Sequence, residues 1–150
     1  MRIVKKSLTV SVAAAFLAIS ACSNGAGGGG GGDGGGEVLR VVVADAEVAS
    51  WTVGDLEKAV PIVEIVVDGD TQSGPRLLDV LAAAGVDDWQ IGEVLGKGEG
   101  RSFDVGLEIS ASDVDEGWIL DVSNRGTLKL ASANLPRQLW VRDVAEIRFP

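Results

Sequence analysis

Residues 73–81, Ser-Gly-Pro-Arg-Leu-Leu-Asp-Val-Leu, predict the start of a short amphipathic helix. Pro75 suits the first turn of a helix, where a missing backbone N–H costs nothing. Gly85 suits the C-terminal cap, because glycine adopts the left-handed conformation that ends many helices. An apolar stripe at helical spacing must pack against another layer of the protein, and this one is supplied by Leu77, Leu78, Leu81 and Ala84.

Strand patterns lie on both sides of this helix. Residues 62–67 predict a strand, and Asp68-Gly69 predicts a tight hairpin turn into a return strand over 70–72. Residues 103–109 alternate apolar and polar side chains, which is typical of a half-buried strand. Further strands are predicted over 38–44, 89–95, 118–122, 127–130 and 139–149, the last with a change of phase near Asp143 that suggests a bulge.

Two capping-box patterns predict further helix starts. Thr52-Val53-Gly54-Asp55 predicts a short helix to Ala59 that Pro61 stops, and Ser110-Ala111-Ser112-Asp113 is a second candidate. Several strands with two or three short helices predict one small α+β domain over residues 37–150.

The N-terminal residues predict an export signal with a lipid attachment site. Arg2, Lys5 and Lys6 precede an apolar run over 7–21, which is too short for a comfortable transmembrane helix. Ile19-Ser20-Ala21-Cys22 resembles the bacterial lipobox, which implies that residues 1–21 are removed and that Cys22 carries the lipid. The alternative is an ordinary secretory signal with Cys22 as a stray thiol.

Residues 22–36 predict a flexible tether between lipid and domain. From Gly25 to Gly36 the chain is glycine except for Ala26 and Asp33, a composition that cannot bury apolar surface. We therefore expect a lipoprotein held in the cell membrane or outer membrane through its lipid anchor, with the domain outside the cytoplasm.

Composition excludes several kinds of chemistry. The chain has no histidine, and Cys22 is its one cysteine, so the domain lacks Ser-His-Asp and Cys-His catalysis and any thiolate metal ligand. The net charge is −9, and it would be −12 without the leader and its three cations. This charge predicts that no nucleic acid is bound.

Three segments of the domain resemble one known family. They are Trp51-Thr52-Val53-Gly54-Asp55-Leu56, residues 73–86 with their Ala84-Gly85-Val86 ending, and residues 135–147 from Leu135-Pro136-Arg137 to Ile147. The sequence from 38 to 150 thereby resembles a shortened oxidoreductase molybdopterin-binding domain, which implies a sulfite-oxidase-like fold. That family binds molybdenum through a cysteine thiolate, and this domain has none, so we expect no cofactor and no molybdopterin.

Basic and aromatic residues supply the candidate binding sites. An oxyanion or cofactor site would form if the arginines converged, and surface ion pairs are the alternative for Arg76, Arg125, Arg137 and Arg142. A stacking platform would form if the tryptophans converged, and packing in the core is the alternative for Trp51, Trp89, Trp118 and Trp140.

Acidic and glycine-rich segments carry weaker signals. The spacing from Asp68 to Asp79 partly resembles a calcium loop, but a hairpin turn accounts for it. Residues 96–101, with three glycines and two cations, suit an anion loop or a connection between strands. Asp113, Asp115 and Glu116 suit a cation site or a helix start. We predict no metal site.

The function expected from the sequence is binding rather than catalysis. We expect a membrane-tethered domain that binds a ligand or a protein partner and has no catalytic residues. One alternative is a molybdopterin-dependent oxidoreductase component of the cell envelope. Another is a hydrolase with two carboxylates that face each other about 5–10 Å apart across a cleft.

Overall fold

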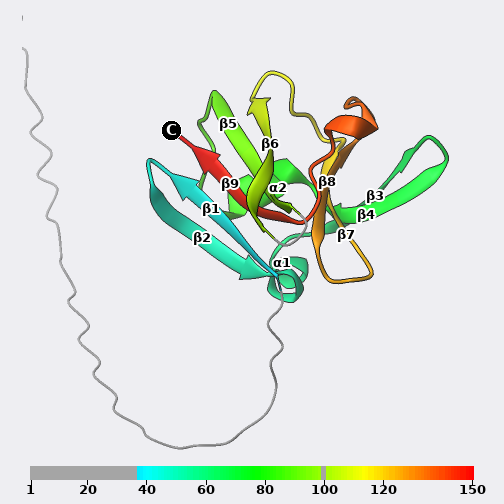
Figure 1. Cartoon of the computed structure of the whole chain (residues 1–150), viewed down its shortest axis with the longest axis horizontal. Helices are drawn as coiled ribbons and strands as arrows, with labels where there is room; N and C mark the ends of the chain where they lie inside the picture. Colours follow the sequence, from blue (N-terminus) through cyan, green and yellow to red (C-terminus); the bar gives the residue numbers. More distant parts are fainter. Residues whose placement is uncertain (1–36, 99–100) are drawn as a thin grey trace, which may run out of the picture. The chain divides into compact units, whose positions relative to one another are not determined.

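The computed structural model describes residues 37–98 and 101–150 (Figure 1). The predicted leader, Cys22 and the glycine tether lie outside the described residues. The described elements are β1 (Val38–Val43), β2 (Ala46–Thr52), α1 (Val53–Ala59), β3 (Ile62–Val67), β4 (Asp70–Pro75), α2 (Leu77–Ala83), β5 (Ile91–Gly98), β6 (Arg101–Ser110), β7 (Trp118–Val122), β8 (Leu128–Ser132), a 3-10 turn (Arg137–Leu139) and β9 (Val144–Phe149).

One sheet and two hairpins make up the architecture. The sheet has the strand order β2-β1-β9-β5-β6, in which β1 and β9 are parallel and the other neighbours are antiparallel. β3 pairs with β4 and β7 with β8, each as a two-stranded sheet. In Figure 1 the β3–β4 hairpin projects from the body of the domain at the right. The structure confirms the prediction of a small α+β domain.

The core lies between α2, one face of the five-stranded sheet and the β7–β8 hairpin. α2 contributes the apolar stripe predicted from the sequence, in which Leu77 and Leu81 are buried, and also the buried Val80, which the prediction did not include. They belong to one cluster with further fully buried residues, among them Leu39, Val41, Leu120, Leu128, Leu130 and Ile147. Apolar burial stabilises the domain without a disulfide, because the domain has no cysteine.

α1 begins and ends where the sequence predicts. Thr52 is the N-cap, and its Oγ1 accepts a hydrogen bond from the backbone N–H of Asp55 at 3.2 Å. The Thr52 hydroxyl also donates to the Asp55 carboxylate at 2.8 Å. This hydrogen bond, together with Lys58, lowers the pKa of Asp55 below its ordinary value.

α2 begins two residues later than predicted. Pro75 is not in its first turn but ends β4, opposite Ile62 of β3. The helix ends as predicted, with Gly85 at φ 75°. The N–H of Gly85 donates to Ala82 O at 3.0 Å and that of Val86 to Leu81 O at 2.9 Å, which together form a Schellman cap.

Gly74 brings β4 against β7. A Cβ atom at this position would lie 1.9 Å from the backbone oxygen of Leu120. On either side of it, Ser73 N donates to Asp121 Oδ1 at 2.7 Å and Arg76 forms an isolated bridge with Ile119. Only glycine permits this approach, so the β3–β4 hairpin is fixed to the β7–β8 hairpin at Gly74.

β2 is an element that the sequence did not predict. It follows β1 through Ala44 and Asp45, which lie at φ 48° and 65°. A two-residue hairpin turn of this kind normally carries Asn-Gly or Asp-Gly. Ala44-Asp45 gives no such signal, so the chain reversal was missed.

Other predicted elements also differ from the structure. β5 covers residues 91–98 rather than 89–95, because Trp89 lies before the strand. Its ring packs edge-on against the ring of Phe149, with 5.2 Å between the two ring centroids. The helix start predicted at Ser110 is wrong, since residues 111–117 form turns in which Asp115 accepts from Gly117 N at 2.8 Å. The strand predicted over 139–149 begins only at Val144, because Asp143 at φ 50° interrupts it.

In the described part of the chain, no helix is long and apolar enough to cross a membrane.

Candidate functional site

A polar hollow lies where β4, β8 and the segment after the 3-10 turn meet. We call it the cationic hollow; its volume is about 450 Å³, and it is lined by Asp70, Thr71, Gln72, Lys129, Arg137, Trp140 and Arg142. Three of these seven side chains are cations, and one is an acid.

Backbone pairing brings the cations of the hollow together. Lys129 is the second residue of β8 and forms an isolated antiparallel bridge with Arg142. The neighbouring Leu130 N–H donates to Val141 O at 2.8 Å. The segment around Arg142 therefore runs beside β8, and the two basic residues Lys129 and Arg142 lie opposite each other.

Lys129 is held in place by two polar partners. Its Nζ donates to Gln72 Oε1 at 2.7 Å and lies 3.0 Å from Asp121 Oδ2. Gln72 is 7% exposed, which makes it one of the few buried polar residues of the domain. The ammonium position is consequently fixed by β4 and β7 as well as by its own strand.

Trp140 forms an aromatic wall of the hollow. Its Nε1 donates to Leu135 O at 3.0 Å, which orients the indole ring. Lys129 Nζ and Arg137 Cζ each lie 5.3 Å from the ring centroid. Cations at this distance are attracted to the ring quadrupole, so the indole holds two positive groups at the edge of one cavity.

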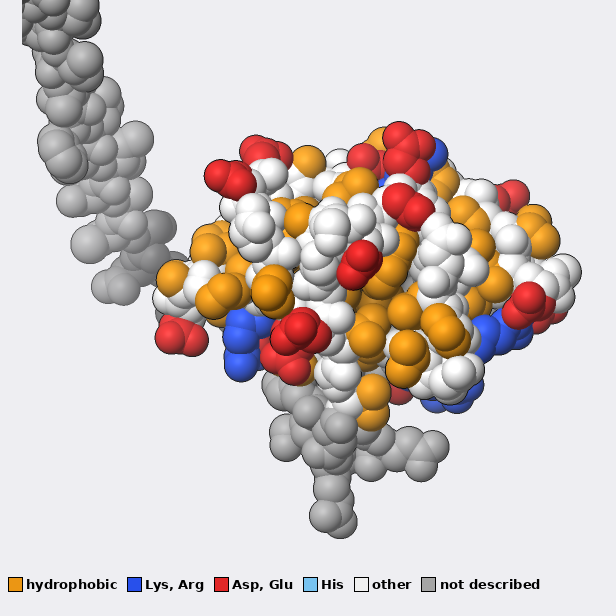
Figure 2. Space-filling view, turned by 90° about the horizontal axis from the view of Figure 1, so that it is seen from above, with side chains coloured by type: hydrophobic (Ala, Val, Ile, Leu, Met, Phe, Trp, Pro, Cys, Tyr) orange, Lys and Arg blue, Asp and Glu red, His pale blue; other side chains and the backbone are white. Residues whose placement is uncertain are grey.

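Arg137 links the hollow to the tip of the β3–β4 hairpin. Its Nε donates to Asp68 Oδ2 at 3.0 Å, and one Nη donates to Asp70 Oδ2 at 3.0 Å and to Val67 O at 2.7 Å. The Asp70 carboxylate is the main reason that the pKa of Arg137 is raised above its ordinary value. Figure 2 shows basic and acidic side chains in contact at this end of the domain, at the right.

The structure places the four candidate arginines in three locations. Arg137 and Arg142 line the cationic hollow together. Arg125 is exposed and lies 3.5 Å from the Asp143 carboxylate. Arg76 precedes α2, and its Nε is buried without a hydrogen-bond partner. Among the described residues, Arg142 has no ion pair.

The tryptophans do not form a common platform. Trp118 is 5% exposed and belongs to the core, while Trp51 and Trp89 are partly buried against it. Trp140 alone lies at the cationic hollow. Sequence reasoning missed Lys129, although its position between the inward-facing Leu128 and Leu130 marks it as pointing out of the core.

The acidic candidates do not gather into a metal site. Asp68-Gly69 is the turn of the β3–β4 hairpin, and Asp79 lies on α2. Asp115 accepts hydrogen bonds from Gly117 N and from Asn134 Nδ2. Across the residues that the structure describes, no three acids are grouped closely enough to hold a metal ion. Within residues 96–101, the first three end β5, Arg101 begins β6, and the two residues between them lie outside the described residues.

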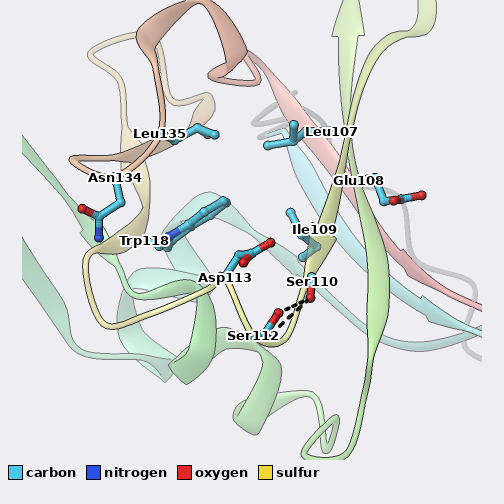
Figure 3. Close-up of a pocket in the computed structure, with 9 residues that line it drawn as sticks. All are labelled: Leu107, Glu108, Ile109, Ser110, Ser112, Asp113, Trp118, Asn134 and Leu135. Carbon is cyan, nitrogen blue, oxygen red and sulfur yellow. Dashed lines mark hydrogen bonds between the residues drawn. The ribbon is translucent and has the colours of Figure 1, made fainter.

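A second hollow of about 470 Å³ lies beside Trp118 (Figure 3). In Figure 3 Asp113 and Trp118 point into it, whereas Glu108 points away from it. The hydroxyls of Ser110 and Ser112 hydrogen-bond to each other at 2.7 Å on its rim. The two acids that line this hollow therefore do not face each other, which removes it as a two-carboxylate hydrolase site.

An ion cluster on the sheet was also missed by sequence reasoning. Glu146 of β9 is 2% exposed, and its carboxylate accepts from Arg40 at 2.6 Å and from Arg148 Nε at 2.8 Å. Arg40 lies opposite Glu146 across the parallel β1–β9 pair. The cluster forms from strands far apart in sequence, and no local pattern marks it.

The described part of the chain is a small α+β domain that carries the cationic hollow with Trp140 as its aromatic wall. Comparison with models of known protein families found no match, and comparison with curated proteins found none.

Proposed function

We propose that this chain is a membrane-tethered lipoprotein whose domain binds a small oxyanion outside the cytoplasm and does not act as an enzyme. One observation carries the binding proposal. Lys129, Arg137 and Arg142 surround a hollow of about 450 Å³ that one aromatic ring lines. A carboxylate, sulfate or phosphate group suits these donors, since charge-assisted hydrogen bonds to such groups are short and strong.

Arg142 is the residue best placed to contribute new binding energy. Arg137 already donates to Asp68, Asp70 and Val67, and Lys129 is held by Gln72 and Asp121. Arg142 has no such partner among the described residues, and its planar guanidinium presents several donors to an oxyanion. In this proposal Lys129 and Arg137 contribute positive charge to the site, and Arg142 donates hydrogen bonds to the ligand.

The sulfite-oxidase-like fold remains part of the proposal, and molybdenum chemistry does not. The family implied by the resemblance uses a cysteine thiolate as its metal ligand, and the cationic hollow offers only nitrogen and oxygen donors. The residues present do not fit a thiolate-bound molybdenum. Metal analysis of the purified chain tests this, and molybdenum in equal molar amount would support the oxidoreductase alternative instead.

We expect Arg142→Ala to weaken oxyanion binding at least tenfold. Removing the guanidinium deletes a charged hydrogen bond worth about 1.5–3 kcal/mol, and about 1.4 kcal/mol corresponds to tenfold. Calorimetric titration of the purified chain with sulfate, phosphate and citrate measures the affinity. Fluorescence of Trp140 alone, with the other tryptophans replaced by phenylalanine, reports on the hollow.

Arg125→Ala is the matched control for this experiment. It removes the same charge from an exposed site whose one ion pair is with Asp143, so it should leave the affinity unchanged. Equal losses in the two variants would mean that net charge alone drives binding. That result, or the lack of saturable binding by all three anions, would overturn the proposed site.

The anchor makes a separate prediction for Cys22→Ser. The hydroxyl cannot take the lipid that the lipobox resemblance implies, so we expect the variant to leave the membrane fraction and to lack the mass of the acyl chains. Stable anchoring requires about two chains, because a single chain gives marginal membrane binding. Full membrane retention with unchanged mass would contradict the lipoprotein proposal without affecting the hollow.

A further inference from the structure

β3 has one edge without a partner strand. It pairs with β4, and no other strand of residues 37–98 and 101–150 joins that two-stranded sheet. The turn consists of Asp68 and Gly69 at φ 52° and 86°, so Val67 and Asp70 form the hydrogen-bonded pair next to it. Because hydrogen-bonded and non-hydrogen-bonded pairs alternate, the backbone groups of 63 and 65 face β4, and those of 62, 64 and 66 face outward.

Pro75 agrees with this assignment of the ladder. It lies opposite Ile62, at a position whose backbone groups do not bond across the β3–β4 pair. A proline in a strand is tolerated where no ladder hydrogen bond is required of it. In the described structure, the outward backbone N–H and C=O groups of Ile62, Glu64 and Val66 form no hydrogen bond with a side chain or a loop.

The side chains along this edge have an apolar-acid-apolar order. Ile62 is 43% and Val66 66% exposed, the latter being the most exposed large apolar residue of the described domain. The exposed Glu64 lies between them, and it has no ion pair with any described cation. Residues two apart on a strand share a face, so the three side chains and the free backbone groups are presented together.

The β3–β4 hairpin has contacts with the rest of the domain at both ends. Arg137 donates to Asp68, Asp70 and Val67 O at the turn. At the other end Gly74 lies against the backbone of Leu120. An edge that is already ordered loses little entropy when a partner strand binds.

We propose that the free edge of β3 binds an extended segment of a partner protein as an added antiparallel strand. The segment carries a lysine or arginine with an apolar residue two positions to either side. Its backbone bonds to the outward groups of residues 62, 64 and 66, its cation faces Glu64, and its apolar side chains cover Ile62 and Val66. This is recognition by strand addition, in which the backbone gives affinity and alternate side chains give specificity.

Charge argues against a second copy of this chain as the occupant. A two-fold antiparallel pairing that matches the whole edge would place Glu64 opposite Glu64 of the second copy. Like charges directly opposite each other across a strand pair are destabilising. A register shifted by two residues in either direction would leave one apolar residue of each edge uncovered, so a basic foreign segment fits better.

A charge reversal tests the proposal on the full chain. The probes are two capped peptides, Thr-Val-Thr-Lys-Thr-Val-Thr and the same peptide with Glu in place of Lys. Amide chemical shifts of residues 62–66 report binding. We expect the lysine peptide to bind at least tenfold more tightly than the glutamate peptide, and Glu64→Lys to reverse that preference. A lysine peptide N-methylated on the amides that face β3 should not bind.

Two control variants show whether peptide binding depends on the β3 edge itself. Glu57→Lys makes the same charge change on an exposed position of α1 and should leave the preference unchanged. Arg142→Ala should also leave peptide binding unchanged, so failure of the cationic hollow and of this edge are distinguishable. No shifts at residues 62–66, equal binding of both peptides, or dimerisation of the chain through β3 in sedimentation would each overturn the proposal.

Discussion

Replacing Gly74 by alanine is expected to lower the free energy of unfolding by about 1–3 kcal/mol, the usual cost of forcing extra volume into a packed site. The new Cβ would lie 1.9 Å from Leu120 O and 2.6 Å from Leu120 C. Both atoms belong to the backbone of a central hairpin, and neither can rotate away. β4 and β7 would have to separate, which would loosen the β3–β4 hairpin on its support.

Gly54→Ala is the matched control, and it should raise the free energy of unfolding instead of lowering it. Gly54 lies exposed in α1, and a Cβ there would meet nothing within 4 Å. Alanine reduces the conformational freedom of the unfolded chain, which stabilises a compatible site by about 0.4–1 kcal/mol. Urea unfolding of the two variants measures both changes. Equal effects of the two substitutions would contradict the close approach at Gly74.

Removing both arginines from Glu146 should have the largest effect on stability. Arg40→Ala combined with Arg148→Ala is expected to lower the free energy of unfolding by about 3–5 kcal/mol, as for other buried charges that lose their partners. The Glu146 side chain is only 3% exposed in the folded domain, so its carboxylate depends on the two guanidinium groups for its charged partners. Each single substitution should cost less, because one arginine would still pair with the carboxylate.

Adding Glu146→Leu to this double variant should restore much of the stability. An apolar side chain needs no counter-ion, and replacing a whole buried ion cluster by apolar residues is often close to neutral. Arg125→Ala serves as the control, since its exposed pair with Asp143 should contribute no more than about 1 kcal/mol. A triple variant no more stable than the double variant would show that the buried carboxylate is not the cause.

Elements with strong local signals could be predicted from the sequence. Thr52 and Pro61 mark the two ends of α1, and Asp68-Gly69 marks the turn between β3 and β4. β2 was missed because Ala44 and Asp45 adopt left-handed conformations without glycine. Pro75 led to a helix start that was predicted too early, because proline also fits a strand position whose N–H makes no hydrogen bond. Pro75 occupies such a position in β4, opposite Ile62.

The candidate site could be predicted only in part. Arg137 and Arg142 were among the four arginines singled out, but nothing local separates them from Arg76 and Arg125. What separates them is the bridge between Lys129 and Arg142, which depends on how residues 137–142 return to β8. Glu146 illustrates the same limit, since its partner Arg40 is 106 positions away in the sequence.

The position of β9 has a consequence for the order of folding. In the sheet order β2-β1-β9-β5-β6, the strand that the ribosome makes last among those described lies at the centre. Before Val144–Phe149 emerges, the β1–β2 and β5–β6 hairpins have no strand between them. The sheet must therefore close in one late step with a long loop, a topology that folds slowly. In the exported lipoprotein that we propose, a chain that crossed the membrane before that step would not have to unfold its central sheet.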